Sequence, residues 1–64
     1  MIGQVKFFDH KKRYGFITGD DGMEYYFSSA NVDIPSGILD RGYTVFFTPS
    51  LNDRGRVALN IKLY

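Results

Sequence analysis

The stretch Arg13-Tyr14-Gly15-Phe16-Ile17 decides how the rest of this chain is interpreted. If it forms a β-strand, successive side chains alternate between the two faces, so that Tyr14 and Phe16 share one face. The opposite face carries Ile17, which suits a core, and a glycine that lets a neighbouring backbone come close. This pattern predicts two rings directed outward, beside the basic run at residues 11–13.

Aromatic rings beside cations on a sheet are typical of surfaces that bind single-stranded nucleic acid. Bases stack on the rings, and phosphates pair with the positive charges. The alternative interpretation is that both rings belong to the core and that the basic run is a solvated turn. The distribution of the other hydrophobic residues distinguishes these two interpretations.

The composition indicates one folded domain that spans residues 1–64. Hydrophobic residues make up 44% of the chain and aromatic residues 17%, which is too apolar for a disordered protein. A chain of 64 residues has no room for a second domain. Because it contains no cysteine and a single histidine, His10, it lacks the ligands of a zinc site. We therefore expect no metal and no cofactor.

The charges matter more by their placement than by their sum. The formal net charge is only +1, so no strong overall field attracts nucleic acid. Lys6 and the basic run at residues 11–13 come early, whereas Asp20, Asp21 and Glu24 follow across the next turn. This argues against a binder with a long phosphate footprint and leaves open a small one that relies on stacking.

The sequence shows no secretory signal and no apolar run long enough to span a membrane. We therefore expect a cytoplasmic protein that has no membrane partner.

Period-two alternation and turn signals predict five short strands, at residues 2–8, 14–18, 23–28, 43–48 and 56–63. The pair Asp21-Gly22 suits a hairpin, Asn52-Asp53-Arg54-Gly55 predicts a second turn, and Pro49 is expected to end the fourth strand. Short strands, tight turns and the lack of a helical period predict a small antiparallel barrel, closed or nearly closed.

The connection from residue 29 to residue 42 has no clear periodicity. A loop of this length in a small domain is usually functional or covers part of the core. Its apolar residues Ile34, Ile38 and Leu39 predict that packing holds it in place.

The remaining hydrophobic residues fill a small barrel without the two rings of the opening stretch. The predicted core consists of Val5, Ile17, Phe27, Val45, Phe47, Leu59 and Ile61. Tyr14, Phe16 and Tyr26 then lie on the outer face of neighbouring strands. Three exposed rings that gather in one place form a patch, which is more informative than scattered rings. This distribution favours a binding surface over a solvated turn.

These motifs resemble those of the cold-shock domain, a five-stranded oligonucleotide-binding (OB-fold) barrel. The opening pattern of that family, G-x-V-K-W-F-N-x-x-K-G-F-G-F-I, is similar to residues 3–17 without a gap. Its second motif, D-V-F-V-H-F-S-A-I, aligns with residues 24–32, and its closing N-R-G-P-x-A-x-N-V aligns with residues 53–61. The resemblance covers the whole chain.

The resemblance implies a nucleic-acid-facing surface made of Lys6, Phe7, Phe8, Lys12, Tyr14, Phe16, Tyr26 and Arg54. Strand alternation independently predicts outward positions for Lys6, Tyr14, Phe16 and Tyr26. Phe7 depends on the resemblance, because strict alternation places it on the same face as Val5 and a bulge would have to turn it outward. Arg13 and Ser28 complete the predicted site.

Three departures from the family pattern predict a shortened stacking surface. Ser28 and Ser29 stand where the family has a histidine and a phenylalanine, and each missing ring removes about 1–3 kcal/mol of stacking. The loop before Leu39 has no clear counterpart of a family aromatic. Arg13 replaces a turn glycine, which adds a charge and also adds strain if the backbone there needs a positive φ.

The leading hypothesis is non-catalytic binding of single-stranded RNA or DNA, with an RNA-chaperone role, by a monomer or weak homodimer without a small-molecule substrate. The second is a protein-interaction barrel whose aromatic patch binds a peptide or another copy of the chain. Binding of nucleic acid weakens steeply with salt and apolar association does not, which separates these two.

Catalysis is a third hypothesis with little support. His10 next to Asp9 is a common surface pair, and Asp20, Asp21 and Glu24 match no calcium-loop spacing. The chain also lacks a P-loop. The choice of RNA or DNA, the preferred bases and the oligomeric state are left open by the sequence.

Overall fold

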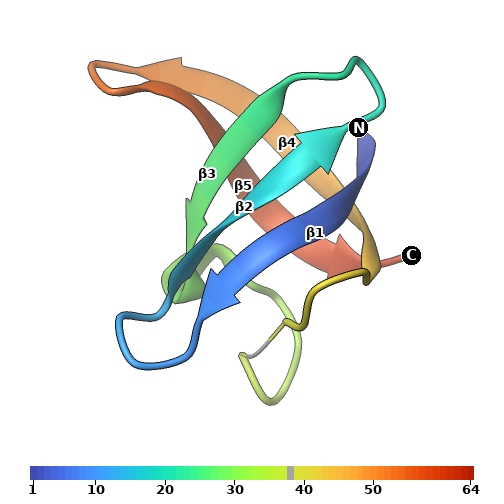
Figure 1. Ribbon diagram of the computed structural model, residues 1–64, viewed down its shortest axis with the longest axis vertical. Coiled ribbons are helices and arrows are strands. Elements are labelled where there is room, and N and C mark those ends of the chain that lie inside the picture. Colours follow the sequence, from blue (N-terminus) through green and yellow to red (C-terminus); the bar gives the residue numbers. More distant parts are fainter. Residues whose placement is uncertain (38) are drawn as a thin grey trace.

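The computed structural model describes residues 1–37 and 39–64, and five strands form the body of this part of the chain. They are β1 (Ile2–Asp9), β2 (Tyr14–Gly19), β3 (Glu24–Ser28), β4 (Thr44–Asn52) and β5 (Gly55–Leu63). The strands close into a barrel in the order β1-β2-β3-β5-β4 (Figure 1). A short 3₁₀ helix, Ser29–Asn31, follows β3. Tight turns join β1 to β2, β2 to β3 and β4 to β5.

The five-stranded OB-fold barrel predicted from the sequence is confirmed, with one correction to its pairing. Four of the strand pairs are antiparallel, but β3 and β5 pair in parallel through Tyr26 and Val57. A tight hairpin forces its two strands to be antiparallel. No hairpin joins β3 to β5, because the long connection and β4 lie between them, so their direction is set by closure of the barrel.

The fourth strand does not end at Pro49, contrary to the prediction. β4 continues to Asn52, and Pro49 lies opposite Ala58 in the pairing with β5. A proline lacks the N–H that a central strand position requires, so it is tolerated where one side of a strand is free. The pairing of β4 with β1 extends only to Phe46. Pro49 therefore occupies a stretch of β4 that has a neighbouring strand on one side.

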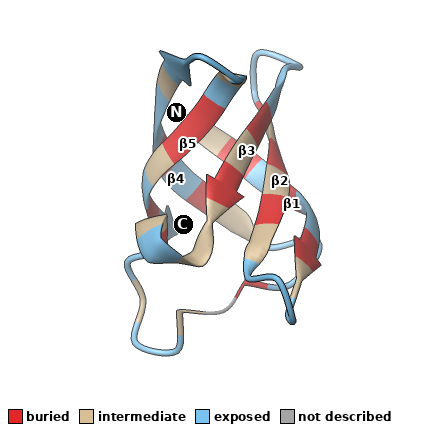
Figure 2. Ribbon diagram, turned by 90° about the vertical axis from the view of Figure 1, so that its left-hand side faces the viewer, coloured by how far each residue is buried: buried red, intermediate tan, exposed pale blue. Residues whose placement is uncertain are grey.

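The core is close to the predicted one and fills the inside of the barrel (Figure 2). Six of the seven predicted residues are buried: Val5, Ile17, Phe27, Val45, Phe47 and Ile61. Leu59 is only half-buried, because β5 does not alternate along its whole length. The register between β4 and β5 shifts, Asn60 has a φ of 52°, and Ala58 is buried instead.

The long connection is held by packing, as predicted for its apolar residues. Leu39 is completely buried and Ile34 packs against the core, whereas Ile38 lies outside the described residues. Val32 is also buried and pairs with Ile61. Among the described residues, no helix is long and apolar enough to cross a membrane.

Candidate nucleic-acid interface

A β-bulge at Lys6 determines which rings of β1 face outward. Val5 pairs with Ile17 on β2, but Phe7 already pairs with Phe16, so β1 carries one extra residue between these two pairs. Alternation therefore restarts after the bulge. Phe7 turns outward with 43% of its surface exposed, whereas Phe8 turns into the core. The outward position of Phe7, for which the sequence required a bulge, is confirmed.

Phe8 is a correction to the predicted site. Its exposed fraction is 8%, and its ring stacks on that of Phe27 with centroids 5.7 Å apart and an interplanar angle of 5°. The ring of His10 packs edge-on against it, with centroids 5.1 Å apart. Because other side chains cover the ring, Phe8 offers no face to a base.

Gly15 allows the bulged part of β1 to lie close to β2. A Cβ atom at this position would overlap the carbonyl oxygen of Phe7 and would lie 3.0 Å from the ring of Phe27. Any side chain would push the two strands apart or displace the core ring. The close backbone approach predicted for this glycine is therefore confirmed, and it fixes Phe7 beside the rings of β2.

Four rings meet on the outer face of β1, β2 and β3, and we call them the aromatic cluster: Phe7, Tyr14, Phe16 and Tyr26. Phe7 pairs with Phe16 across β1 and β2, and Phe16 pairs with Tyr26 across β2 and β3. Neighbouring centroids are 5.8–6.2 Å apart. Tyr14, Phe16 and Tyr26 are half-buried and lie outside the core. The interpretation of Tyr14 and Phe16 as core residues is therefore wrong.

The mutual orientation of the rings is mixed. Three of the four contacts have interplanar angles of 69–81°, whereas the rings of Tyr14 and Tyr26 are tilted by 30°. Edge-to-face pairs are favourable arrangements of aromatic rings. The cluster is thus held together by its own contacts, and it presents rings on three neighbouring strands to solvent.

The predicted cations differ in their ion pairing and in their position on the barrel. Lys6, at the bulge, forms an ion pair with Glu24 at the start of β3, and both side chains are about half exposed. Lys12 is exposed in the turn between β1 and β2. Arg54 is exposed in the β4–β5 turn, at the opposite end of the barrel from the β1–β2 turn (Figure 1). Lys12 and Arg54 thus lie in turns at opposite ends of the barrel.

The backbone at Arg13 has the positive φ for which the sequence analysis predicted strain. Its φ is 61°, a left-handed conformation that residues with a side chain rarely adopt. Its N–H donates to the carbonyl oxygen of Asp9 at 2.7 Å, and its own carbonyl accepts from the N–H of Ser29 at 2.8 Å. Its guanidinium lies 3.6 Å from where a Cβ of Gly37 would stand. Arg13 thus joins the β1–β2 turn to the connection after β3.

Asp9 organises the same turn. Its Oδ1 accepts hydrogen bonds from the N–H groups of Lys12 at 3.0 Å and Lys11 at 2.9 Å. The hydrogen bond from Lys12, followed by that from Lys11, holds the pKa of Asp9 below its usual value. The charged form of Asp9 therefore fixes the loop that carries Lys12.

The cluster ends at the end of β3. Ser28 pairs with Tyr14 and is half-buried, and Ser29 begins the 3₁₀ helix. Neither residue carries a ring, and the truncation of the stacking surface at this end stays a prediction. Ser28 can donate or accept a hydrogen bond at this edge.

Two residues next to the predicted site were missed by the sequence argument. Glu24 forms an ion pair with Lys6, whereas the sequence showed it only as one of three acidic residues across the turn from the basic run. Arg41 lies in a hollow beside Phe7, although it is 34 positions away in the chain. Its position depends on how the long connection returns to β1, which alternation does not predict.

Comparison with known proteins agrees with this geometry. The sequence model of the "'Cold-shock' DNA-binding domain" matches residues 1–64. The chain belongs to the cold-shock domain family. It is 41% identical over 61 residues to cold shock protein 1 of Lactiplantibacillus plantarum, covering 92% of this chain and 91% of that protein. It is 34% identical over 64 residues to a cold shock-like protein of Thermotoga maritima, covering 98% and 97% of the two chains.

The side chains considered for catalysis have structural partners in this cold-shock domain. His10 Nε2 lies 3.3 Å from Oδ1 of Asp40, and Asp21 accepts hydrogen bonds from the Tyr25 hydroxyl at 2.6 Å and the Met23 N–H at 3.0 Å. The Tyr25 hydroxyl, and then Met23, lower the pKa of Asp21. Within residues 1–37 and 39–64, no three acidic or histidine side chains gather as metal ligands.

Proposed function

We propose that this cold-shock domain binds single-stranded nucleic acid by stacking bases on the aromatic cluster. The observation that carries the proposal is that rings from three neighbouring strands share one outer face, with the centroids of contacting rings no more than 6.2 Å apart. Membership of a nucleic-acid-binding family supports it. Unpaired bases present their faces to such a surface, whereas the bases of a duplex are already stacked on one another.

The surrounding cations give this surface its second component. We expect Lys12 and Arg13 at one end of the barrel and Arg54 at the other to contact the sugar-phosphate backbone. We expect Lys6 to contribute when phosphate displaces Glu24. Stacking accepts any base, so the protein binds with little sequence preference. A protein that holds unpaired strands opposes hairpin formation, which is the basis of the RNA-chaperone activity that we propose.

The first test compares single and double strands. A fluorescence titration that follows the tyrosines of the cluster should show binding to oligothymidine and oligouridine, and weaker binding to a duplex of equal length. Equal or tighter binding to the duplex would contradict stacking, because the rings cannot reach paired bases.

The salt dependence separates this function from a peptide-binding or self-association role of the same rings. Roughly two to four neutralised phosphates predict a slope of log affinity against log salt of about −1.5 to −3, since each contact to a single strand contributes about −0.7. A slope near zero would support apolar association, which is insensitive to salt. Sedimentation of the free protein over the same salt range supplies the control for self-association.

A further inference from the structure

We infer that the interface continues across β1 into a nucleotide subsite built around Arg41; this inference rests on the proposed function. The outer surface beside Phe7 is hollowed to about 580 Å³ between β1, the end of β2 and the chain just before β4. Pockets for small ligands span roughly 300–1,000 Å³. The hollow therefore suits a nucleotide-sized group directly next to an exposed ring.

The backbone fixes Arg41 at this place. The N–H of Gly42 donates to the carbonyl oxygen of Val5 at 2.8 Å, and the N–H of Val5 donates to the carbonyl oxygen of Tyr43 at 2.9 Å. These bonds attach the chain before β4 to β1 opposite the bulge. Gly42 has a φ of 93°, a conformation that favours glycine, so the turn that sets Arg41 on the hollow is built into the sequence.

The side chains that line the hollow can bind the sugar-phosphate backbone of a nucleic acid. Arg41 is exposed, and it forms none of the ion pairs found within residues 1–37 and 39–64, whereas Lys6 on the same hollow is bound to Glu24. A guanidinium binds phosphate oxygens through two parallel hydrogen bonds. Gln4 and Thr18 add an amide and a hydroxyl, which can bind a sugar or the edge of a base.

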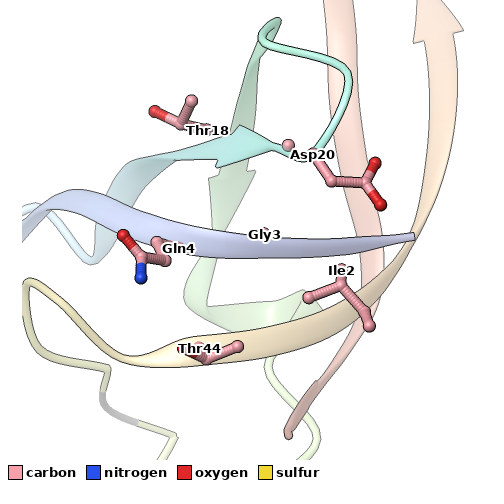
Figure 3. A pocket seen from close by; sticks show the side chains of 7 residues that line it. Ile2, Gly3, Gln4, Thr18, Asp20 and Thr44 are labelled. Carbon is pink, nitrogen blue, oxygen red and sulfur yellow. The ribbon is translucent and has the colours of Figure 1, made fainter.

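The subsite has a defined end. Gln4 and Thr18 also line an adjoining hollow with Ile2, Thr44 and Asp20, and Figure 3 shows the Asp20 carboxylate on the side of that hollow away from Gln4. A carboxylate repels phosphate, so a strand that leaves Phe7 over Arg41 stops before Asp20. The surface that lacks rings at Ser28 and Ser29 is thereby extended on the opposite side, across β1.

The test compares two lengths of oligothymidine on three proteins: the parent, Arg41→Gln and Lys62→Gln. Lys62 lies on β5 and is paired with Asp33 at 3.7 Å, so its variant removes one positive charge elsewhere. Oligomers of roughly four and roughly six nucleotides cover the cluster alone and the cluster with the subsite. The parent should bind the longer oligomer more tightly, with shifts of the Gly42 amide and the Gln4 side-chain amide in NMR spectra.

Arg41→Gln should bind the short oligomer like the parent and lose roughly fivefold in affinity for the long one at about 0.1 M salt. For the long oligomer, its slope of log affinity against log salt should be less negative by about 0.7. Lys62→Gln should match the parent on both. The subsite is disproved if Arg41→Gln matches the parent on both lengths, if it weakens both equally, or if Lys62→Gln reproduces its effect. If the parent binds neither oligomer, the proposed function itself is contradicted.

Discussion

Arg13 is the residue at which sequence and backbone conflict. Its φ of 61° costs about 1–2 kcal/mol for a residue with a Cβ. A glycine there removes this strain but loses about 0.5–1 kcal/mol of stability, because its unfolded chain has more conformational entropy. Arg13→Gly should therefore raise the free energy of unfolding by about 0.5–1 kcal/mol in a urea titration. Lys12→Gly removes the same charge at a neighbour without a positive φ, and it should destabilise the protein. Equal changes in the free energy of unfolding of the two variants would show that the backbone at Arg13 is not strained.

We expect Glu24 to limit the affinity of the proposed interface, because a phosphate must displace it to reach Lys6. An exposed ion pair is worth about 0–1 kcal/mol, so Glu24→Gln should leave stability nearly unchanged and raise oligonucleotide affinity by up to about fivefold. Asp33→Asn makes the same change of charge by releasing Lys62 on β5, and it serves as the control in the same titration. A similar rise in both variants would indicate overall charge rather than release of Lys6.

The β1–β2 turn is an element whose stability depends on the charge of Asp9. The pKa of Asp9 is lower in the folded protein than its usual value of about 3.9, so its contribution is fully present above that pH. The contribution is lost as the pH falls through the lowered folded value. Asp9→Asn keeps an acceptor oxygen but does not titrate, so its stability should fall less steeply below about pH 4.

Urea titrations at several pH values check this expectation. Asp21, whose pKa the Tyr25 hydroxyl also lowers, remains in both proteins and accounts for the acid sensitivity that the variant retains. Identical acid profiles for the parent and Asp9→Asn would show that the turn does not depend on the carboxylate.

At the scale of elements, the sequence could predict strands where alternation is regular and failed where a strand bulges. The strands around Tyr14 and Tyr26 lie within about a residue of the predicted bounds because turn signals flank them. The bulge at Lys6 and the irregular register near Asn60 depend on how two strands approach each other in space. Phe8 and Leu59 were misplaced for this reason, since one extra residue reverses which side chain faces inward.

Over the whole molecule, the candidate site divides into a predictable and an unpredictable part. Tyr14, Phe16 and Tyr26 follow from alternation on adjacent strands, so their shared face could be predicted from the residues alone. The ion pairs of the cations could not be predicted in the same way, because long flexible side chains pair according to tertiary contacts. Arg41 reaches the hollow beside Phe7 through the closure of the barrel, which brings the chain before β4 next to β1.

We propose that the outer face of the barrel binds nucleic acid whereas its interior stabilises the fold, and two phenylalanines separate these roles. Phe47 is 3% exposed and packs against Tyr25 with ring centroids 5.0 Å apart. Phe47→Ala should cost about 3–5 kcal/mol, a large part of the stability of so small a domain. Phe16 is half-buried on the outer face, so Phe16→Ala should change the free energy of unfolding by about 1 kcal/mol or less.

The most direct test is a fluorescence titration of Phe16→Ala with oligothymidine and oligouridine, accompanied by thermal melts of both variants. Phe16→Ala should remain folded and lose about 1–3 kcal/mol of affinity, roughly five- to a hundred-fold, because one stacking partner is gone. Melting of Phe16→Ala while Phe47→Ala stays folded would mean that the faces are assigned in reverse. A folded Phe16→Ala that binds both oligonucleotides as tightly as the parent would contradict the account.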